Sequence, residues 1–172
     1  MIVVDASVVG DALVVDGEAG AAAARALAAD ATWAAPAHLT IEVLSVLRKH
    51  YLRGRLSDIR AGQVLGALQM LEFERVDISL LIDRIWELKE KVSVYDAAYV
   101  AAAELLEVPL LTGDTRLTTA PGPRCRIITP GGASAYARPG SEERTTRRNG
   151  LPSLSGGRSA RQPSVKELCQ PV

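Results

Sequence analysis

Five short apolar runs recur along the first 130 residues, and segments with helical patterning separate most of them. Short apolar runs bounded by turn residues are typical of buried strands. Strands that alternate with helices are joined by crossover connections, which place the strands side by side in a parallel sheet. The sequence therefore predicts an α/β fold, a three-layer α/β/α sandwich with a short parallel sheet. The expected strands are IVV (2–4), TWAAP (32–36), FERVDI (73–78), VPLLT (108–112) and CRIIT (125–129).

Residues that begin and end helices lie in the intervals between these runs. Ser7 and Ser57 are expected to cap helices, and Gly54 is expected to close one. The helix that begins at Ser79 should turn an apolar stripe inward, formed by Leu81, Ile82, Ile85, Trp86 and Leu88. The expected helices cover residues 7–14, 17–29, 38–54, 57–71, a segment from 79 onward, and 93–106.

The alternating pattern stops at Pro130. Residues 131–172 are rich in Gly, Ser, Pro and Arg and offer little apolar surface to bury, so we expect a disordered tail after one domain of residues 1–130. The tail holds seven basic and three acidic residues, although the whole chain has a net charge of zero. A solvated tail and a tail that contacts RNA phosphates are both compatible with this composition.

The composition does not indicate a nucleic-acid-binding, disulfide-rich, membrane or secreted protein. Lys plus Arg equal Asp plus Glu at 20 each, so composition alone does not predict a nucleic-acid-binding protein. Cys125 and Cys169 are too few for a disulfide framework or a cysteine metal cluster. No apolar run reaches the roughly 18 residues of a membrane span, and the first residues lack the basic start of a secretory signal. We therefore expect a cytoplasmic protein without membrane contact.

Two acidic residues follow expected strands. Asp5 comes directly after the first strand, and Asp114 follows the PLLT segment by two residues. In an open parallel sheet, ligands bind beyond the carboxyl ends of the strands. Both carboxylates should therefore lie at the same edge of the sheet, although an Asp at a strand end also commonly caps the next helix.

Two further acidic residues lie on expected helices. Glu42 falls within the inward stripe formed by Leu39, Val43, Val46 and Leu47, where an unpaired carboxylate is costly. It therefore has a buried partner, or the stripe opens into a cleft, or Glu42 lies at a solvated stripe edge. Asp96 is the last residue of a Ser-x-x-Asp pattern, which has the shape of a capping box. The same first helical turn also faces the sheet edge.

The four carboxylates Asp5, Glu42, Asp96 and Asp114 are thus expected to converge. Like charges at close range raise one another's pKa, and a hard cation relieves that repulsion. An all-oxygen ligand set selects Mg²⁺, with Mn²⁺ as the alternative, over zinc. Such sites suit hydrolysis of phosphodiesters.

These motifs resemble those of PIN-domain ribonucleases, most closely the VapC-type toxins of bacterial type II toxin–antitoxin pairs. The resemblance covers about residues 1–130 and is carried by MIVVDASVV, by IEVLSVLRK after PAHL, by VYDAAYVAAAELLEVPLLTGDTRL and by IITP. It implies a PIN-like fold and a Mg²⁺-dependent endoribonuclease that leaves a 5′-phosphate and a 3′-hydroxyl. It further implies an RNA substrate, a homodimer and a cognate antitoxin protein.

The resemblance also implies a role for each site residue. Asp5 and Asp96 would be the principal metal ligands, Glu42 would bind or orient metal-bound water, and Asp114 would complete the catalytic site. Ser7 and Thr112 match the small hydroxyl residues that hold these acids in place.

Two alternatives keep the same fold. A catalytically silent PIN-like module would bind RNA or protein without cutting, although such a scaffold has no need for clustered carboxylates. A nuclease acting on flapped or single-stranded DNA would be expected to carry DNA-gripping insertions that this compact chain lacks. Arg116, beside Asp114, is either a phosphate contact or an ordinary surface arginine.

Overall fold

The computed structural model describes residues 1–135, and most of the segment expected to form a tail, residues 136–172, lies outside the described residues. Residues 131–135 of that segment, together with the preceding proline, form the 3₁₀ helix η3 (Pro130–Ala135), so the start of the expected tail is helical. Within the described part of the chain, no helix combines the length and the apolar character that crossing a membrane requires.

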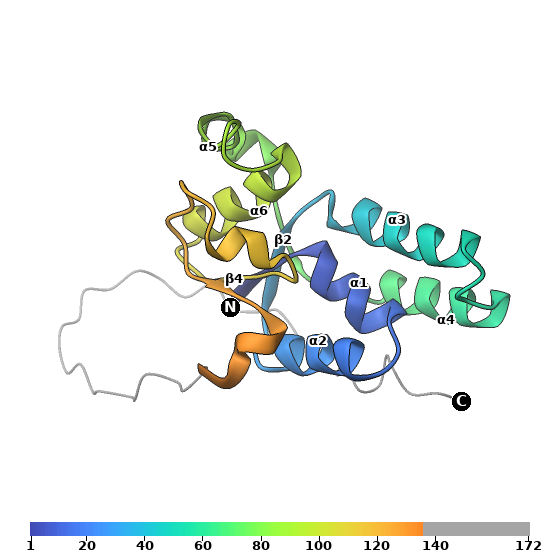
Figure 1. Ribbon diagram of the computed structural model, residues 1–172. Helices are drawn as coiled ribbons and strands as arrows, with labels where there is room; N and C mark the ends of the chain where they lie inside the picture. Colours follow the sequence, from blue (N-terminus) through green and yellow to red (C-terminus); the bar gives the residue numbers. More distant parts are fainter. Residues whose placement is uncertain (136–172) are drawn as a thin grey trace, which may run out of the picture.

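A five-stranded parallel sheet forms the centre of the molecule, as the alternation of strands and helices predicts (Figure 1). The strand order is β3-β2-β1-β4-β5, so the first strand lies in the middle. Val3 pairs with Ala34 on one side and with Leu110 on the other. The strands are β1 (Ile2–Val4), β2 (Trp33–Pro36), β3 (Glu74–Val76), β4 (Leu110–Leu111) and β5 (Ile127–Ile128).

Helices cover the sheet, which confirms the expected α/β architecture. Helix α6 (Val94–Leu105) packs against β1, β2 and β4, and α5 (Ile82–Glu87) packs on α6. Helix α1 (Ala6–Val14) packs against α2 (Glu18–Ala28) and α3 (Leu39–Leu52), and α3 packs beside α4 (Asp58–Gln69) (Figure 1).

Small side chains explain how closely α6 approaches the sheet. Five alanines of this helix are buried, together with Tyr99 and Val100. Alanine has high helix propensity and little volume, so the helix backbone can lie near the strands. This packing fixes the position of the first turn of α6, which carries Asp96.

The sequence prediction for the segment after β3 is partly wrong. The helix expected from Ser79 is divided into the 3₁₀ helix η1 (Ile78–Leu80), which Asp77 caps by accepting a hydrogen bond from the amide of Ser79, and the short helix α5. Leu81, Ile85 and Leu88 are buried as expected, but Ile82 and Trp86 are exposed. A helix this short presents one face to α6, so residues one position from the buried stripe remain in solvent.

The start of α1 also differs from the prediction. Ser7 is not the cap of this helix. Asp5 is the N-cap residue, and its carboxylate accepts a hydrogen bond from the amide of Ser7 at 3.1 Å. The cap therefore lies two residues earlier than expected, and the capping carboxylate belongs to the acid that follows β1.

Candidate active site

Asp5 lies at the carboxyl end of the central strand and is only 6% exposed. One carboxylate oxygen accepts the Ser7 amide, and the other accepts the Thr112 hydroxyl at 2.5 Å. Burial raises the pKa of Asp5, hydrogen bonds from Thr112 and Ser7 oppose the shift, and the charge of Asp96 adds to it. Among the described residues, Asp5 is the one charged residue that is buried, and its hydrogen-bond donors are neutral groups.

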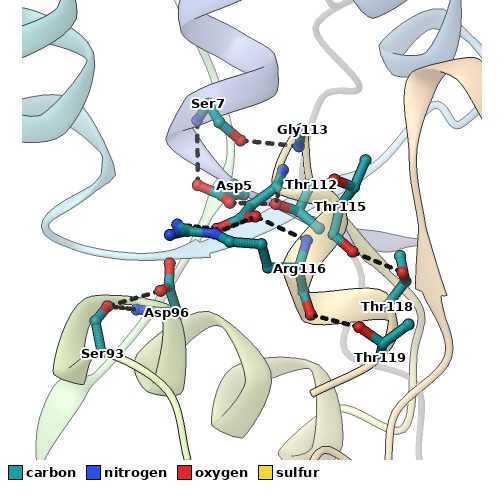
Figure 2. Close-up of polar contacts among 11 residues, drawn as sticks. Asp5, Ser7, Ser93, Asp96, Thr112, Gly113, Thr115, Arg116, Thr118 and Thr119 are labelled. Carbon is teal, nitrogen blue, oxygen red and sulfur yellow. Dashed lines mark hydrogen bonds and ion pairs between the residues drawn. The ribbon is translucent and has the colours of Figure 1, made fainter.

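Two small hydroxyl residues connect the end of β1 with the turn after β4 (Figure 2). The Thr112 hydroxyl donates to Asp5 and accepts the amide of Asp114 at 3.0 Å. The Ser7 hydroxyl accepts the amide of Gly113 at 2.9 Å. These are the residues expected to hold the acids in place, and through them two strand ends far apart in the sequence are joined.

Asp96 lies in the first turn of α6, where the serine-to-aspartate spacing predicts a cap. The Ser93 hydroxyl accepts the amide of Asp96 at 3.1 Å and also lies 2.7 Å from its carboxylate, to which it donates. The cap therefore does not remove Asp96 from the site. Its charge acts on both Asp5 and Glu42.

Glu42 lies in the first turn of α3, and its side chain is 29% exposed. The buried Tyr99 hydroxyl donates to its carboxylate at 2.6 Å. Burial raises the pKa of Glu42, the bond from Tyr99 opposes the shift, and the charges of Asp5 and Asp96 add to it. Of the three interpretations that the sequence allows for Glu42, the buried partner describes the structure.

His38 and Tyr99 are neighbours of the acids that sequence reasoning missed. The His38 ring packs edge-on against Tyr99, with ring centroids 5.0 Å apart, and its Nε2 atom is 3.5 Å from Glu42 without forming a hydrogen bond. Burial lowers the pKa of His38, and the Asp5 charge opposes this shift. Helical spacing was the available signal, because His38 precedes Glu42 by four residues and Tyr99 follows Asp96 by three.

Asp114 caps the 3₁₀ helix η2 (Thr115–Thr118) and is held by Arg116. The Arg116 amide donates to Asp114 Oδ1 at 2.9 Å, and the guanidinium contacts both carboxylate oxygens. The bond with Arg116 lowers the pKa of Asp114. The sequence left Arg116 as either a phosphate contact or an ordinary surface arginine. In the structure it forms an ion pair with Asp114.

Asp5, Glu42 and Asp96 therefore lie within reach of one another's charges, and Asp114 is joined to Asp5 through Thr112. Two of these acids, Asp96 and Asp114, border a hollow. A cavity of about 600 Å³ is lined by Asp96, Asp114 and Arg116, together with Lys91 and Ser93 among others. No group of three or more His, Cys, Asp or Glu side chains in residues 1–135 is already arranged to hold a metal ion. In this structure Arg116, Ser93 and Tyr99 engage the carboxylates of Asp114, Asp96 and Glu42.

The chemistry of the donors nevertheless fits a hard divalent cation. All four candidate ligands are carboxylates, the oxygen donors that Mg²⁺ and Mn²⁺ prefer. Burial raises the pKa of Asp5 and of Glu42, and neighbouring carboxylates add to both shifts. A dication beside these groups would favour their ionised forms.

Comparison with known proteins identifies the family of this chain. The family profile of the PIN domain matches residues 2–122. "Ribonuclease VapC1" of Mycobacterium tuberculosis is 44% identical over 126 residues, which cover 73% of this chain and 94% of the relative. "Ribonuclease VapC9" of the same organism is 38% identical over 127 residues, covering 74% of this chain and 96% of the relative. "VapC ribonuclease Mb0985" of Mycobacterium bovis matches to the same extent. The chain belongs to the PIN-domain family and, within it, to the VapC ribonucleases.

Proposed function

We propose that this chain is a Mg²⁺-dependent endoribonuclease, able to use Mn²⁺, that cleaves RNA phosphodiester bonds at the edge formed by Asp5, Glu42, Asp96 and Asp114. The observation that carries the proposal is the position of Asp5, which is 6% exposed at the end of the central strand and is joined through the Thr112 hydroxyl to the main chain of Asp114. Glu42 and Asp96 come from two further elements, and their charges and that of Asp5 act on one another. The names of the relatives as ribonucleases support the reaction class. A catalytically silent module would gain nothing from this buried negative charge, whose assembly costs free energy.

The surroundings of each acid support a specific role in metal binding or catalysis. Asp5 and Asp96 are the principal ligands, because one is fixed at the end of β1 and the other in the first turn of a tightly packed helix. Glu42, held by Tyr99, orients the attacking water or accepts its proton. Asp114 completes the site at the edge of the cavity. When bound, a divalent cation supplies Lewis acidity that polarises the phosphoryl group and the attacking water.

Neutral hydroxyl groups hold the carboxylates of Asp5, Glu42 and Asp96. The Thr112 hydroxyl donates to the carboxylate of Asp5 and accepts the main-chain amide of Asp114, so one side chain connects the segments that carry two acids. Ser7 adds a second connection between the same two segments. Water-excluding residues around Asp5 strengthen its interaction with any cation, because charges interact more strongly at low dielectric.

The biological role proposed here is that of the toxin of a type II toxin–antitoxin pair, acting in the cytoplasm as a homodimer and inhibited by a cognate antitoxin protein. Apolar surface supports the protein partners. A cavity of about 440 Å³ between α3 and α4 is lined by Leu44, Leu47, Tyr51 and Leu65 among others. The nearby side chains of Ile41, Leu52 and Ile59 are exposed, and exposed apolar patches commonly mark protein interaction sites.

The test is cleavage of structured and unstructured RNA by the purified full-length chain in Mg²⁺, Mn²⁺ or chelator. Asp5→Asn and Asp96→Asn should abolish cleavage while the proteins remain folded, and Asp83→Asn, which removes an exposed acid of α5, is the matched control. A single-stranded DNA substrate in parallel tests the DNA-nuclease alternative. RNA cleavage in chelator, or cleavage that survives both substitutions, would refute the proposal. RNA binding without cleavage would favour the silent module.

A further inference from the structure

Arg116 is a cationic residue inside the candidate site that the proposed reaction does not use. It lies in η2, two residues after Asp114, and its side chain is 87% exposed. Figure 2 shows this side chain reaching from η2 back across the site toward Asp96. The charge of Asp96 acts on the guanidinium, which places Arg116 within the field of more than one site acid.

The contact with Asp114 uses both oxygens of the carboxylate. The Arg116 Nε atom lies 2.9 Å from Oδ1 and 3.0 Å from Oδ2, and a terminal nitrogen also contacts Oδ2. The main-chain amide of Arg116 adds a further bond to Oδ1. Arginine suits this geometry because its planar guanidinium presents several donors in a fixed fork.

A divalent cation and this guanidinium need the same carboxylate. Coordination of a metal requires an oxygen lone pair directed at the ion, and the guanidinium bonds occupy positions on both Asp114 oxygens. The two cations also repel each other at short range. In the described structure, therefore, the guanidinium of Arg116 stands where a cation would contact the carboxylate of Asp114.

The backbone that carries Arg116 is held independently of its side chain. The Thr118 hydroxyl donates to the carbonyl of Thr115 at 2.6 Å, and the Thr119 hydroxyl lies 3.3 Å from the carbonyl of Arg116 (Figure 2). Leu117 of the same turn is buried. The exposed guanidinium can therefore leave Asp114 without unfolding η2.

We propose that Arg116 is an internal counter-ion that occupies Asp114 in the metal-free protein and competes there with the divalent cation. This inference rests on the proposed metal-dependent function. Arg116 neutralises part of the acidic site until a cation arrives, and binding of the cation at Asp114 requires the guanidinium to swing away. Metal affinity is thereby set lower than the four carboxylates alone would produce.

The test is Mn²⁺ binding to the full-length chain, measured by isothermal titration calorimetry. Arg116→Gln removes the positive charge and the guanidinium contacts with both Asp114 oxygens. We expect it to lower the dissociation constant for Mn²⁺ by about three- to tenfold. Arg116→Lys keeps the charge without the bidentate geometry and should give an intermediate value. Lys91→Gln is the matched control, because Lys91 lines the same cavity and forms no ion pair among the described residues.

A double variant identifies the contact responsible. In an Asp114→Asn background, Arg116→Gln should change the dissociation constant by no more than Lys91→Gln does. If wild type and Arg116→Gln bind Mn²⁺ with the same affinity, the competition is refuted and the metal site stands. If none of these proteins binds Mn²⁺, the proposed metal-dependent function fails and this inference fails with it.

Discussion

Thr112→Val is the substitution that most sharply tests how the site is assembled. Thr112 is completely buried, and valine preserves its branched shape while removing the hydroxyl. That hydroxyl donates to the carboxylate of Asp5 and accepts the amide of Asp114. A bond to a charged group contributes about 1.5–3 kcal/mol and a neutral bond about 0.5–1.5 kcal/mol, so we expect a loss of about 2–4.5 kcal/mol in the free energy of unfolding.

The control for this substitution is Thr112→Ser, which retains the hydroxyl and loses one methyl group. Burial of a methyl group contributes about 1 kcal/mol, so the serine variant should lose clearly less stability than the valine variant. Both free energies of unfolding are measured by urea denaturation in chelator at pH 7. Equal losses for the two variants would refute the argument that the hydroxyl organises the site.

The pH dependence of the Thr112→Val effect gives a second check. The hydroxyl stabilises ionised Asp5, and a stabilisation of this kind is present above the pKa and lost as the pH falls. Burial nevertheless leaves the pKa of Asp5 above its ordinary value of 3.8. The stability difference between wild type and Thr112→Val should therefore begin to shrink while the pH is still above 3.8, as acid titration protonates Asp5. A difference that stays constant throughout the acid titration would show that Asp5 is not the group involved.

Three further substitutions test neighbouring contacts. Tyr99→Phe removes the hydroxyl that donates to Glu42, so it should weaken Mn²⁺ binding several-fold in calorimetry and lower the free energy of unfolding by about 1 kcal/mol. Unchanged Mn²⁺ affinity would show that Tyr99 does not position Glu42. Asp96→Asn relieves repulsion and should leave the metal-free protein at least as stable in thermal melts, whereas a loss of more than about 1 kcal/mol would assign Asp96 a mainly capping role. Gly113→Ala places a Cβ 3.2 Å from the Ser7 hydroxyl oxygen and should cost about 1 kcal/mol, measured in urea, by displacing that hydroxyl; wild-type stability would contradict this.

The sequence predicts the parts of this structure that depend on local pattern. Short apolar runs between helical segments indicate the parallel sheet, because burial of a strand on both faces leaves a continuous apolar run. Asp5 and Asp114 are recognisable because they follow such runs, and the ends of parallel strands share one edge. Glu42 is recognisable because a carboxylate interrupts an otherwise apolar stripe.

Features that depend on contacts between distant elements were not predictable in the same way. The bond between Tyr99 and Glu42 joins two helices whose relative position only the folded sheet determines. The pairing of Arg116 with Asp114 depends on the conformation of η2, which residue composition does not specify. At the start of α1, Asp5 and Ser7 are both good capping residues, and the extended backbone at Asp5 decides between them.

The central claim is that the four acids form one binding site for a divalent cation, and a crystal soaked in Mn²⁺ tests it most directly. The expected result is a peak in the anomalous difference map bound by carboxylate oxygens of Asp5 and Asp96, about 2.0–2.4 Å from the ion. The guanidinium of Arg116 should be displaced from Asp114 in the same crystal. Mn²⁺ bound elsewhere, with these carboxylates unoccupied in a protein that still cleaves RNA, would contradict the account.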